Sequence, residues 1–189
     1  VYAIFATGDV AAFDFAGKPL WAKNIARPDN HYGHASSLTT HKDMLIVQFD
    51  QGQEDDDQSK LYALGGATGK LVWEHQRPSM MSWTSPISFE SAGKRQLVTT
   101  AEPWAFSNDP DTGEELWRAE IAIGELGPSP TYARGLCLVI SPNNELVALR
   151  VDGSGDVGDT HIAWSSVEGA PDIVSPLADG ERVYLLTTF

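Results

Sequence analysis

The sequence predicts an all-β fold that is built from a repeated four-stranded unit. Three segments each consist of a glycine turn followed four residues later by tryptophan: residues 13–21, 67–73 and 109–117. Their tryptophans, Trp21, Trp73 and Trp117, lie 52 and 44 residues apart (21 to 73 and 73 to 117). A period of this size is typical of arrays of supersecondary units, and four-stranded units of this length are the blades of a β-propeller.

The strands of one unit can be read in residues 127–165. Residues 136–140 form an apolar run of strand length, and residues 145–150 alternate between polar and apolar side chains, with turn residues before and after each run. No segment of helical length carries an apolar stripe at the spacing i, i+3, i+4, i+7. We therefore expect short strands joined by turns throughout the chain.

A second marker sets the phase of the repeat. The pairs Ser85-Pro86, Ser129-Pro130 and Ser175-Pro176 recur at spacings of 44 and 46 residues, and Ser36-Ser37 stands 49 residues before the first pair. Proline lacks a backbone donor and is tolerated at the first residue of a strand. We therefore place each pair at the start of a blade's innermost strand, and the repeated tryptophan on the fourth, outermost strand.

This phase predicts a single propeller domain or fragment in which both ends of the sequence fall within a blade. Residues 1–6 and 184–189 each read as a second strand. The expected blades, partial at either end, are residues 1–26, 33–77, 82–122, 127–166 and 172–189. About four blades are thus expected, as a fragment of a longer propeller or as a ring closed by joining its ends.

The turn before each tryptophan resembles a known motif. The pattern Ala/Leu-x-Asp-x-x-Thr-Gly-x-x-x-Trp is similar to the tryptophan docking motif of pyrroloquinoline-quinone (PQQ) repeat propellers. Residues 152–164 resemble a lengthened docking turn that is common in extracytoplasmic PQQ-like propeller proteins of planctomycete-type bacteria. WD-repeat propellers match less well, because none of the six tryptophans is followed by Asp.

The resemblance implies a PQQ-like, quinoprotein-like propeller of seven or eight blades and a bacterial, periplasmic or otherwise extracytoplasmic location. Two departures affect the local turns. Gly65 stands where Asp is usual, and the turn in the first unit is one residue shorter.

Composition excludes several classes of partner. The formal net charge is −13, which argues against nucleic acid and against an anionic membrane surface, because both require basic stripes. No apolar run approaches the 18 residues of a membrane span. Cys137 is the only cysteine and lies in an apolar run, so we expect a buried core residue and no internal disulfide.

The repeated tryptophans and the turn aspartates have a structural interpretation. Regular spacing favours packing of Trp21, Trp73, Trp117 and Trp164 between neighbouring blades over stacking on a ligand. The aspartates in or beside the turns are expected to accept hydrogen bonds from nearby backbone N–H groups, with a catalytic role as the alternative. These aspartates are Asp14, Asp109 and Asp111.

Two acidic segments could bind calcium. Asp152, Asp156 and Asp159 alternate with glycines as in a cation loop, but residue 163, where an EF-hand loop has Glu, is Ala. Residues 54–57 form a short acidic run in a turn. In both places a solvated turn is the favoured interpretation, and a metal site is the alternative.

A candidate ligand site lies where segments enter the innermost strands. These segments, residues 30–34, 80–83, 124–127 and 170–173, precede the phase marker and would converge on one mouth of the central channel. They do not repeat one another, whereas structural positions should recur from blade to blade. Ordinary loop variation is the alternative. The side chains expected to shape a ligand site are His31, Tyr32, His34, Trp83, Glu125 and Asp172.

The preferred function is a non-catalytic binding or protein-interaction scaffold that needs no cofactor. Nucleophile, zinc-protease and phosphate-loop signatures are absent from the sequence, and the cysteine pair of PQQ dehydrogenases cannot form from one cysteine. The chain is similar to propeller lipoproteins that assist outer-membrane assembly. The alternative is a quinoprotein-type oxidoreductase that binds PQQ and calcium at the channel mouth. Open blade edges also predict self-association.

Overall fold

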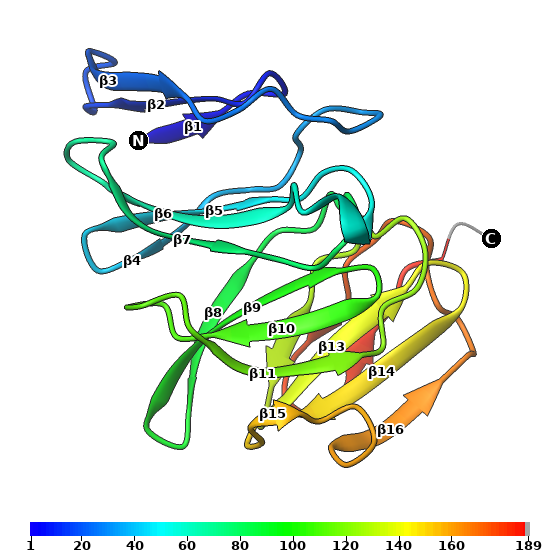
Figure 1. Ribbon diagram of the computed structural model, residues 1–189. Coiled ribbons are helices and arrows are strands. Elements are labelled where there is room, and N and C mark those ends of the chain that lie inside the picture. The colour runs from blue at the N-terminus through cyan, green and yellow to red at the C-terminus, as the bar shows by residue number, and fades with distance from the viewer. Residues whose placement is uncertain (188–189) are drawn as a thin grey trace.

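The computed structural model describes residues 1–187, and its regular secondary structure is almost entirely β-strand. Five sheets follow one another in chain order, from the N-terminal sheet (blue) to the C-terminal one (red) in Figure 1. Among the described residues, the one helical segment is the short 3-10 helix η1 (Glu54–Asp56). The predicted all-β propeller of four-stranded blades is confirmed, while the total number of blades stays a prediction.

The sheets repeat one antiparallel connectivity. The first contains β1 (Tyr2–Ile4), β2 (Asp9–Phe13) and β3 (Pro19–Asn24). The second contains β4 (Thr39–His41), β5 (Met44–Phe49), β6 (Lys60–Gly65) and β7 (Leu71–Gln76). The third contains β8 (Ile87–Ser91), β9 (Lys94–Ala101), β10 (Trp104–Asn108) and β11 (Glu115–Glu120). Each strand therefore lies beside its neighbours in sequence, as in a blade.

The remaining sheets continue this order with one addition. The fourth contains β12 (Thr131–Ala133), β13 (Leu136–Ser141), β14 (Glu145–Arg150) and β16 (Ile162–Ser166). The fifth contains β17 (Leu177–Ala178) and β18 (Val183–Tyr184). The lengthened turn between β14 and β16 contributes β15 (Gly155–Asp156), which pairs in parallel with β11 of the third sheet. This turn thus ties two neighbouring blades together, which the sequence did not predict.

The phase marker has a direct physical role. The Ser37 N–H donates to Ser85 Oγ (2.8 Å), the Ser85 N–H to Ser129 Oγ (2.8 Å), and the Ser129 N–H to Ser175 Oγ (2.9 Å). A strand begins just after each serine, at β4, β8, β12 and β17. Each hydroxyl therefore joins the innermost strand of one blade to that of the next, and this explains why serine recurs at this position.

The hydrophobic core lies between the sheets. Strand β5 is buried along its whole length, and its alternate side chains point to opposite faces. Leu45 and Val47 belong to a cluster with Val10 of the first sheet. On the other face, Ile46 packs with Leu97 of the third sheet. Sheets covered on both faces explain why the strands read as apolar runs rather than as strict alternation.

Three repeated tryptophans contact the next sheet. The Trp21 indole N–H donates to the Gly66 carbonyl (2.8 Å). Gly69 and Gly113 have φ angles of +66° and +79°, in the left-handed region that favours glycine. A Cβ at Gly69 would lie 2.6 Å from Trp21 Cε3, and one at Gly113 would lie 2.7 Å from Trp73 Cε3. The turn glycines therefore adopt the left-handed conformation of the turn, and their lack of a side chain leaves space for the neighbouring tryptophan ring.

The fourth repeated tryptophan differs from this pattern. Trp117 is only 1% exposed, whereas Trp164 on β16 is 40% exposed, so the expectation that it is packed away between blades is wrong for the described structure. The physical reason is that, within residues 1–187, the fifth sheet consists of β17 and β18. Among these residues no turn between a third and a fourth strand faces Trp164.

Two of the turn aspartates behave as expected. Asp14 Oδ1 accepts from the N–H groups of Ala16 and Lys18 (both 2.9 Å), and Asp109 Oδ1 accepts from the Asp111 N–H (2.8 Å). These bonds fix the turn conformation.

Asp111 has a different role from its neighbour in the turn. Its Oδ1 lies 2.5 Å from Lys42 Nζ and 2.9 Å from His41 Nε2, both in the second sheet. The hydrogen bond from Lys42, followed by that from His41, holds the pKa of the Asp111 carboxyl below its ordinary value. Asp111 therefore links two blades instead of closing its own turn.

Cys137 lies in the core, as predicted. Its side chain is fully buried between the third and fourth sheets. Burial raises the pKa of its thiol to about 12, because the charged thiolate is unfavourable in an apolar environment.

No helix among residues 1–187 is long and apolar enough to cross a membrane.

Candidate ligand pocket at the channel mouth

The segments that enter the innermost strands are held by backbone hydrogen bonds, either directly or through Gly52 in the loop between β5 and β6. The Gly52 N–H donates to the Asp29 carbonyl (2.9 Å), and the Met81 N–H donates to the Gly52 carbonyl (3.0 Å). Farther along, the Trp83 N–H donates to the Leu126 carbonyl (2.9 Å). Each of these bonds connects one blade to a neighbour, so the mouth segments are held in place rather than being independent loops.

These segments border an open pocket of about 480 Å³. It is lined by Tyr32, Trp83, Gly124, Glu125, Gly127, Pro142, Asp172 and Ile173. Four of the six side chains that the sequence singled out therefore surround one space, although they come from four different inter-blade segments. The phase marker explains this convergence, because each segment precedes an innermost strand at the same end of its sheet.

Aromatic rings form one side of the pocket. The ring centroids of Tyr32 and Trp83 lie 5.2 Å apart at an interplanar angle of 54°. His31 is exposed and meets Tyr32 edge-on at 6.3 Å, next to the lining residues rather than among them. Tyr32 is 72% exposed, so its ring offers a free face to a ligand.

The polar side of the pocket is acidic. Glu125 and Asp172 both line it and both are exposed. The lining residues include no lysine or arginine. The pocket therefore has a negative potential within a chain whose net charge is already −13.

His34 lies apart from the pocket. Its ring is buried and stacks on Phe49 of β5, with a centroid distance of 5.2 Å and an interplanar angle of 16°. Its Nε2 lies 3.1 Å from the Ser36 carbonyl. Desolvation lowers the pKa of this imidazole. His34 therefore packs the first inter-blade segment against the second sheet, unlike its exposed neighbour His31.

A buried polar cluster that sequence reasoning missed lies next to Trp83. Asp50 forms an ion pair with Arg77, and both side chains are at most 4% exposed. Asp50 Oδ2 also accepts from the Ser82 hydroxyl (2.6 Å) and from the Gln48 amide (2.6 Å). A glutamine within the apolar run of β5 was the available signal, since buried polar groups require partners.

This cluster fixes the position of Trp83. Ser82 and Thr84 flank Trp83 in the chain and both are buried. The Thr84 hydroxyl donates to the Thr100 carbonyl of β9 (2.6 Å), while Ser82 is held by Asp50. The aromatic side of the pocket thus rests on a hydrogen-bonded base that spans the second and third sheets.

Several carboxylates in the acidic segments considered for calcium make contacts with other groups of the protein. Asp156 Oδ1 accepts from the Gly158 N–H (3.1 Å), and Asp152 Oδ1 lies 3.8 Å from His161 Nε2. In the acidic run, Glu54 accepts from the Trp104 indole N–H (3.3 Å). Throughout residues 1–187, no group of three or more His, Cys, Asp or Glu side chains is placed to hold a metal ion. For Asp152, Asp156 and Asp159, a role in metal binding stays a prediction.

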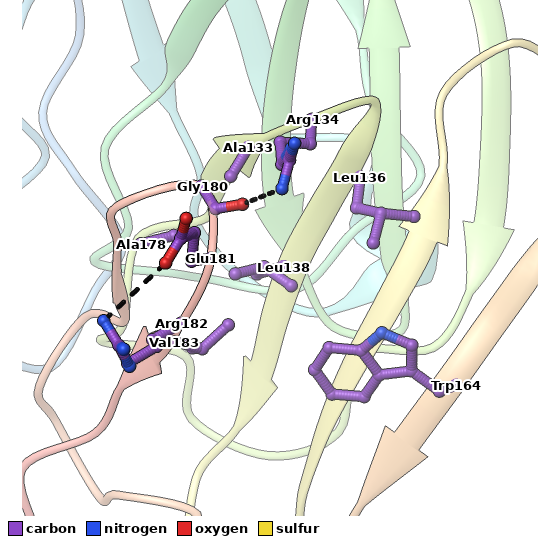
Figure 2. Close-up of a pocket in the computed structure, with 10 residues that line it drawn as sticks. All are labelled: Ala133, Arg134, Leu136, Leu138, Trp164, Ala178, Gly180, Glu181, Arg182 and Val183. Atoms are coloured by element: carbon purple, nitrogen blue, oxygen red, sulfur yellow. Dashed lines mark hydrogen bonds and ion pairs between the residues drawn. The ribbon is translucent and has the colours of Figure 1, made fainter.

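A second, smaller pocket of about 170 Å³ lies between the fourth sheet and the β17–β18 hairpin. Figure 2 shows Trp164 on one side of it and the hairpin residues Gly180 to Val183 on the other. Arg134 spans the space by donating to the Gly180 carbonyl (2.8 Å). This pocket coincides with the interface at which Trp164 lacks a covering turn among the described residues, so we assign it to blade packing.

Comparison with known proteins places these features among PQQ-like repeats. Residues 57–188 match a family model described as "Outer membrane protein assembly factor BamB". A 1-butanol dehydrogenase (quinone) from Thauera butanivorans is 27% identical over 141 residues, which cover 67% of this chain and 22% of that enzyme. The chain thus spans about a fifth of the length of this relative.

Two solved structures share the fold. BamB from Moraxella catarrhalis superposes with a TM-score of 0.51 at 13% identity, covering 99% of this chain and 66% of that protein. A quinohemoprotein alcohol dehydrogenase from Pseudomonas putida HK5 superposes with a TM-score of 0.60 at 15% identity, covering 95% of this chain and 36% of that enzyme. At these identities the likeness concerns the fold alone.

Proposed function

The chain belongs to the PQQ-like repeat family described as outer membrane protein assembly factor BamB, and on that basis we propose that it is a non-catalytic scaffold that binds a protein partner at the channel mouth. The observation that carries this proposal is the mouth pocket. Four non-repeated segments converge there on one space of about 480 Å³, whereas the recurring serines and turn glycines serve blade packing.

The surface around the pocket suits a protein partner. Tyr32 and Ile173 are each 72% exposed, and Ile123 beside the pocket is 55% exposed. Large apolar side chains exposed next to charged ones are typical of protein interaction sites. Because backbone hydrogen bonds already fix the segments that carry these side chains, little ordering entropy would oppose binding.

We also propose that the protein acts outside the cytoplasm. This location follows from the family resemblance, and its partner would then be another periplasmic or membrane-associated protein. Fractionation of cells that produce the full-length protein tests it: recovery with the cytoplasmic fraction would contradict the proposal.

Site-specific photo-crosslinking tests the binding site. The change is benzoylphenylalanine at Tyr32, with Phe15 as the matched control position. Phe15 is fully exposed and lies in the turn between β2 and β3, at the opposite end of the sheets from the mouth. We expect partner adducts from position 32 and none from position 15. Adducts from position 15 alone would contradict a mouth-directed scaffold.

A second candidate function, a quinoprotein-type oxidoreductase, is favoured by the similarity to the quinone-dependent 1-butanol dehydrogenase. The mouth pocket does not fit the quinone by itself. PQQ is a polycarboxylate, and the pocket offers it Glu125 and Asp172 with no lysine or arginine among its lining residues. Like charges oppose binding of the free quinone, so a bridging cation such as calcium would be required to hold it there.

Absorbance spectroscopy decides between the two functions. The full chain is supplied with PQQ and calcium, separated from the free quinone, and scanned in the near ultraviolet and visible. We expect no retained quinone. A stoichiometric bound spectrum would overturn the scaffold proposal in favour of the enzyme.

Self-association through open blade edges stays a separate prediction. In the part of the chain that the structure describes, β1 pairs with β2 on one side, and β18 with β17 on one side. Unpaired strand edges are templates for a second copy. Light scattering at micromolar concentration should therefore detect dimers or larger species, and a monodisperse monomer would contradict this prediction.

A further inference from the structure

We infer that the mouth pocket recognises an organic cation, namely the guanidinium group of an arginine side chain that a partner polypeptide presents together with apolar neighbours. This inference rests on the proposed function, because it names the chemistry by which the mouth selects its partner. It is carried by two carboxylates and two aromatic rings that converge on one pocket from different blades.

The carboxylates define the sign of the ligand's charge. Glu125 and Asp172 come from two successive inter-blade segments, and both line the same space. No lysine or arginine of the lining neutralises them. Two carboxylates on rigid, separate segments can accept the several N–H donors of one guanidinium, which a single anion on a flexible loop would hold less specifically.

The aromatic pair provides a face for the same cation. Tyr32 and Trp83 lie 5.2 Å apart, and a guanidinium within about 6 Å of such a ring is attracted by its quadrupole. The chain already uses this contact twice in its own packing. Arg118 lies over Trp104 at 5.2 Å, and Arg77 lies over Phe106 at 5.1 Å.

The volume of the pocket and the apolar side chains at its edge favour a polypeptide over a small free guanidinium compound. A volume of about 480 Å³ is in the range of ordinary ligand pockets of about 300–1,000 Å³ and leaves space beyond one guanidinium. Pro142 and Ile173 line that space, and Ile173 is highly exposed. Apolar residues next to the arginine would cover these side chains.

Calorimetric titration of the full chain with designed probes tests the inference. The first probe is the peptide acetyl-Leu-Arg-Leu-Arg-Leu-amide. The second replaces both arginines with citrulline, which has nearly the same shape but no charge. The third is agmatine, a small free molecule that carries one guanidinium and one ammonium group and therefore the same charge as the arginine peptide without its apolar residues. We expect the arginine peptide to bind at least about tenfold more tightly than the other two, as expected for two exposed ion pairs acting together with a ring contact.

Charge variants locate the effect. The double variant Glu125→Gln, Asp172→Asn should lower the affinity for the arginine peptide to that for the citrulline peptide. The control Glu114→Gln, Asp159→Asn removes the same charge from two exposed carboxylates in turns at the opposite end of the sheets. It should change the affinity by less than about twofold, because exposed charges at a distance are screened.

The remaining outcomes overturn the inference. Equal affinity for the arginine and citrulline peptides, or no binding of either, excludes recognition of a cation. Equal loss in both double variants would assign the effect to net charge, and equal binding of agmatine and the arginine peptide would exclude the polypeptide source. A different outcome is that Tyr32→Ala abolishes binding of both peptides while the charge variants have no effect. That result would refute recognition of a cation but would leave the proposal that the mouth binds a protein partner intact.

Discussion

Replacing Trp117 with alanine tests whether the repeated tryptophan stabilises the interface between blades. Trp117 is 1% exposed and belongs to the core cluster between the third and fourth sheets. Its indole N–H donates to Gln96 Oε1 (2.8 Å). Gln96 keeps other partners in the variant, since it accepts from the Ser107 hydroxyl (3.0 Å) and donates to the Val151 carbonyl (2.8 Å). The expected loss is therefore mainly apolar contact.

The magnitude follows from burial. A fully buried tryptophan removes about 150–250 Å² from water, and at about 25 cal/mol per Å² this predicts a loss of about 4–6 kcal/mol. Trp164→Ala is the matched control, since the residue type and the repeat position are the same. Trp164 is 40% exposed, so its loss should be smaller in proportion to its burial, at about 2–4 kcal/mol.

Equilibrium urea unfolding, followed by circular dichroism, measures both variants. With unchanged slopes, the midpoint of Trp117→Ala should fall about 1.7 times as far as that of Trp164→Ala. Equal shifts in the two variants would refute the argument that contact with the next sheet stabilises the repeated tryptophan. An unchanged midpoint in Trp117→Ala would refute its placement in the core.

Three further predictions use the same unfolding assay. Asp50→Asn should lower stability by about 3 kcal/mol, because it leaves a buried guanidinium unpaired; a change below about 1 kcal/mol would contradict this. Gly113→Ala should destabilise by about 1–2 kcal/mol more than Gly93→Ala, since both have positive φ but only Gly113 would clash with the neighbouring blade; equal losses would argue against that contact. Lys42 lowers the pKa of Asp111, so the stabilisation is present above the carboxyl's ordinary value near 3.8 and is lost as pH falls through the folded pKa. Asp111→Asn should therefore be less stable than the parent at pH 6, with the difference vanishing in acid; a constant difference would exclude the ion pair as its cause.

The repeat itself was readable from the sequence because structural roles recur from blade to blade. Each blade needs a hydroxyl that reaches the neighbouring innermost strand, and this need leaves serine at positions such as Ser85 and Ser129. Each of the first blades also presents its tryptophan to a turn glycine such as Gly69. The repeated residues thus mark contacts that every blade makes. The phase of the repeat is sufficient to predict that the mouth segments lie at one end of the sheets.

The rest depends on contacts between segments that are distant in sequence. The burial of His34 is decided by Phe49 on another strand, and no local pattern distinguishes it from the exposed His31. The exposure of Trp164 depends on the sheet that follows it. Asp50 and Arg77 follow two strands of the same sheet and lie 27 residues apart, and the third blade completes their cluster with Ser82. Gln48 signals that polar partners are needed, but no local spacing identifies which residues they are.

The central claim is that the mouth segments bind the partner. Hydrogen–deuterium exchange of the full chain, alone and with the partner that crosslinking identifies, tests this claim most directly. Recognition at the mouth predicts that the partner slows exchange in the inter-blade segments that converge there: residues 30–34, 80–84, 124–127 and 170–173. Exchange should not change in the turns at the opposite end: residues 14–18, 66–70 and 109–114. Protection confined to those turns, with the mouth segments unchanged, would contradict the account.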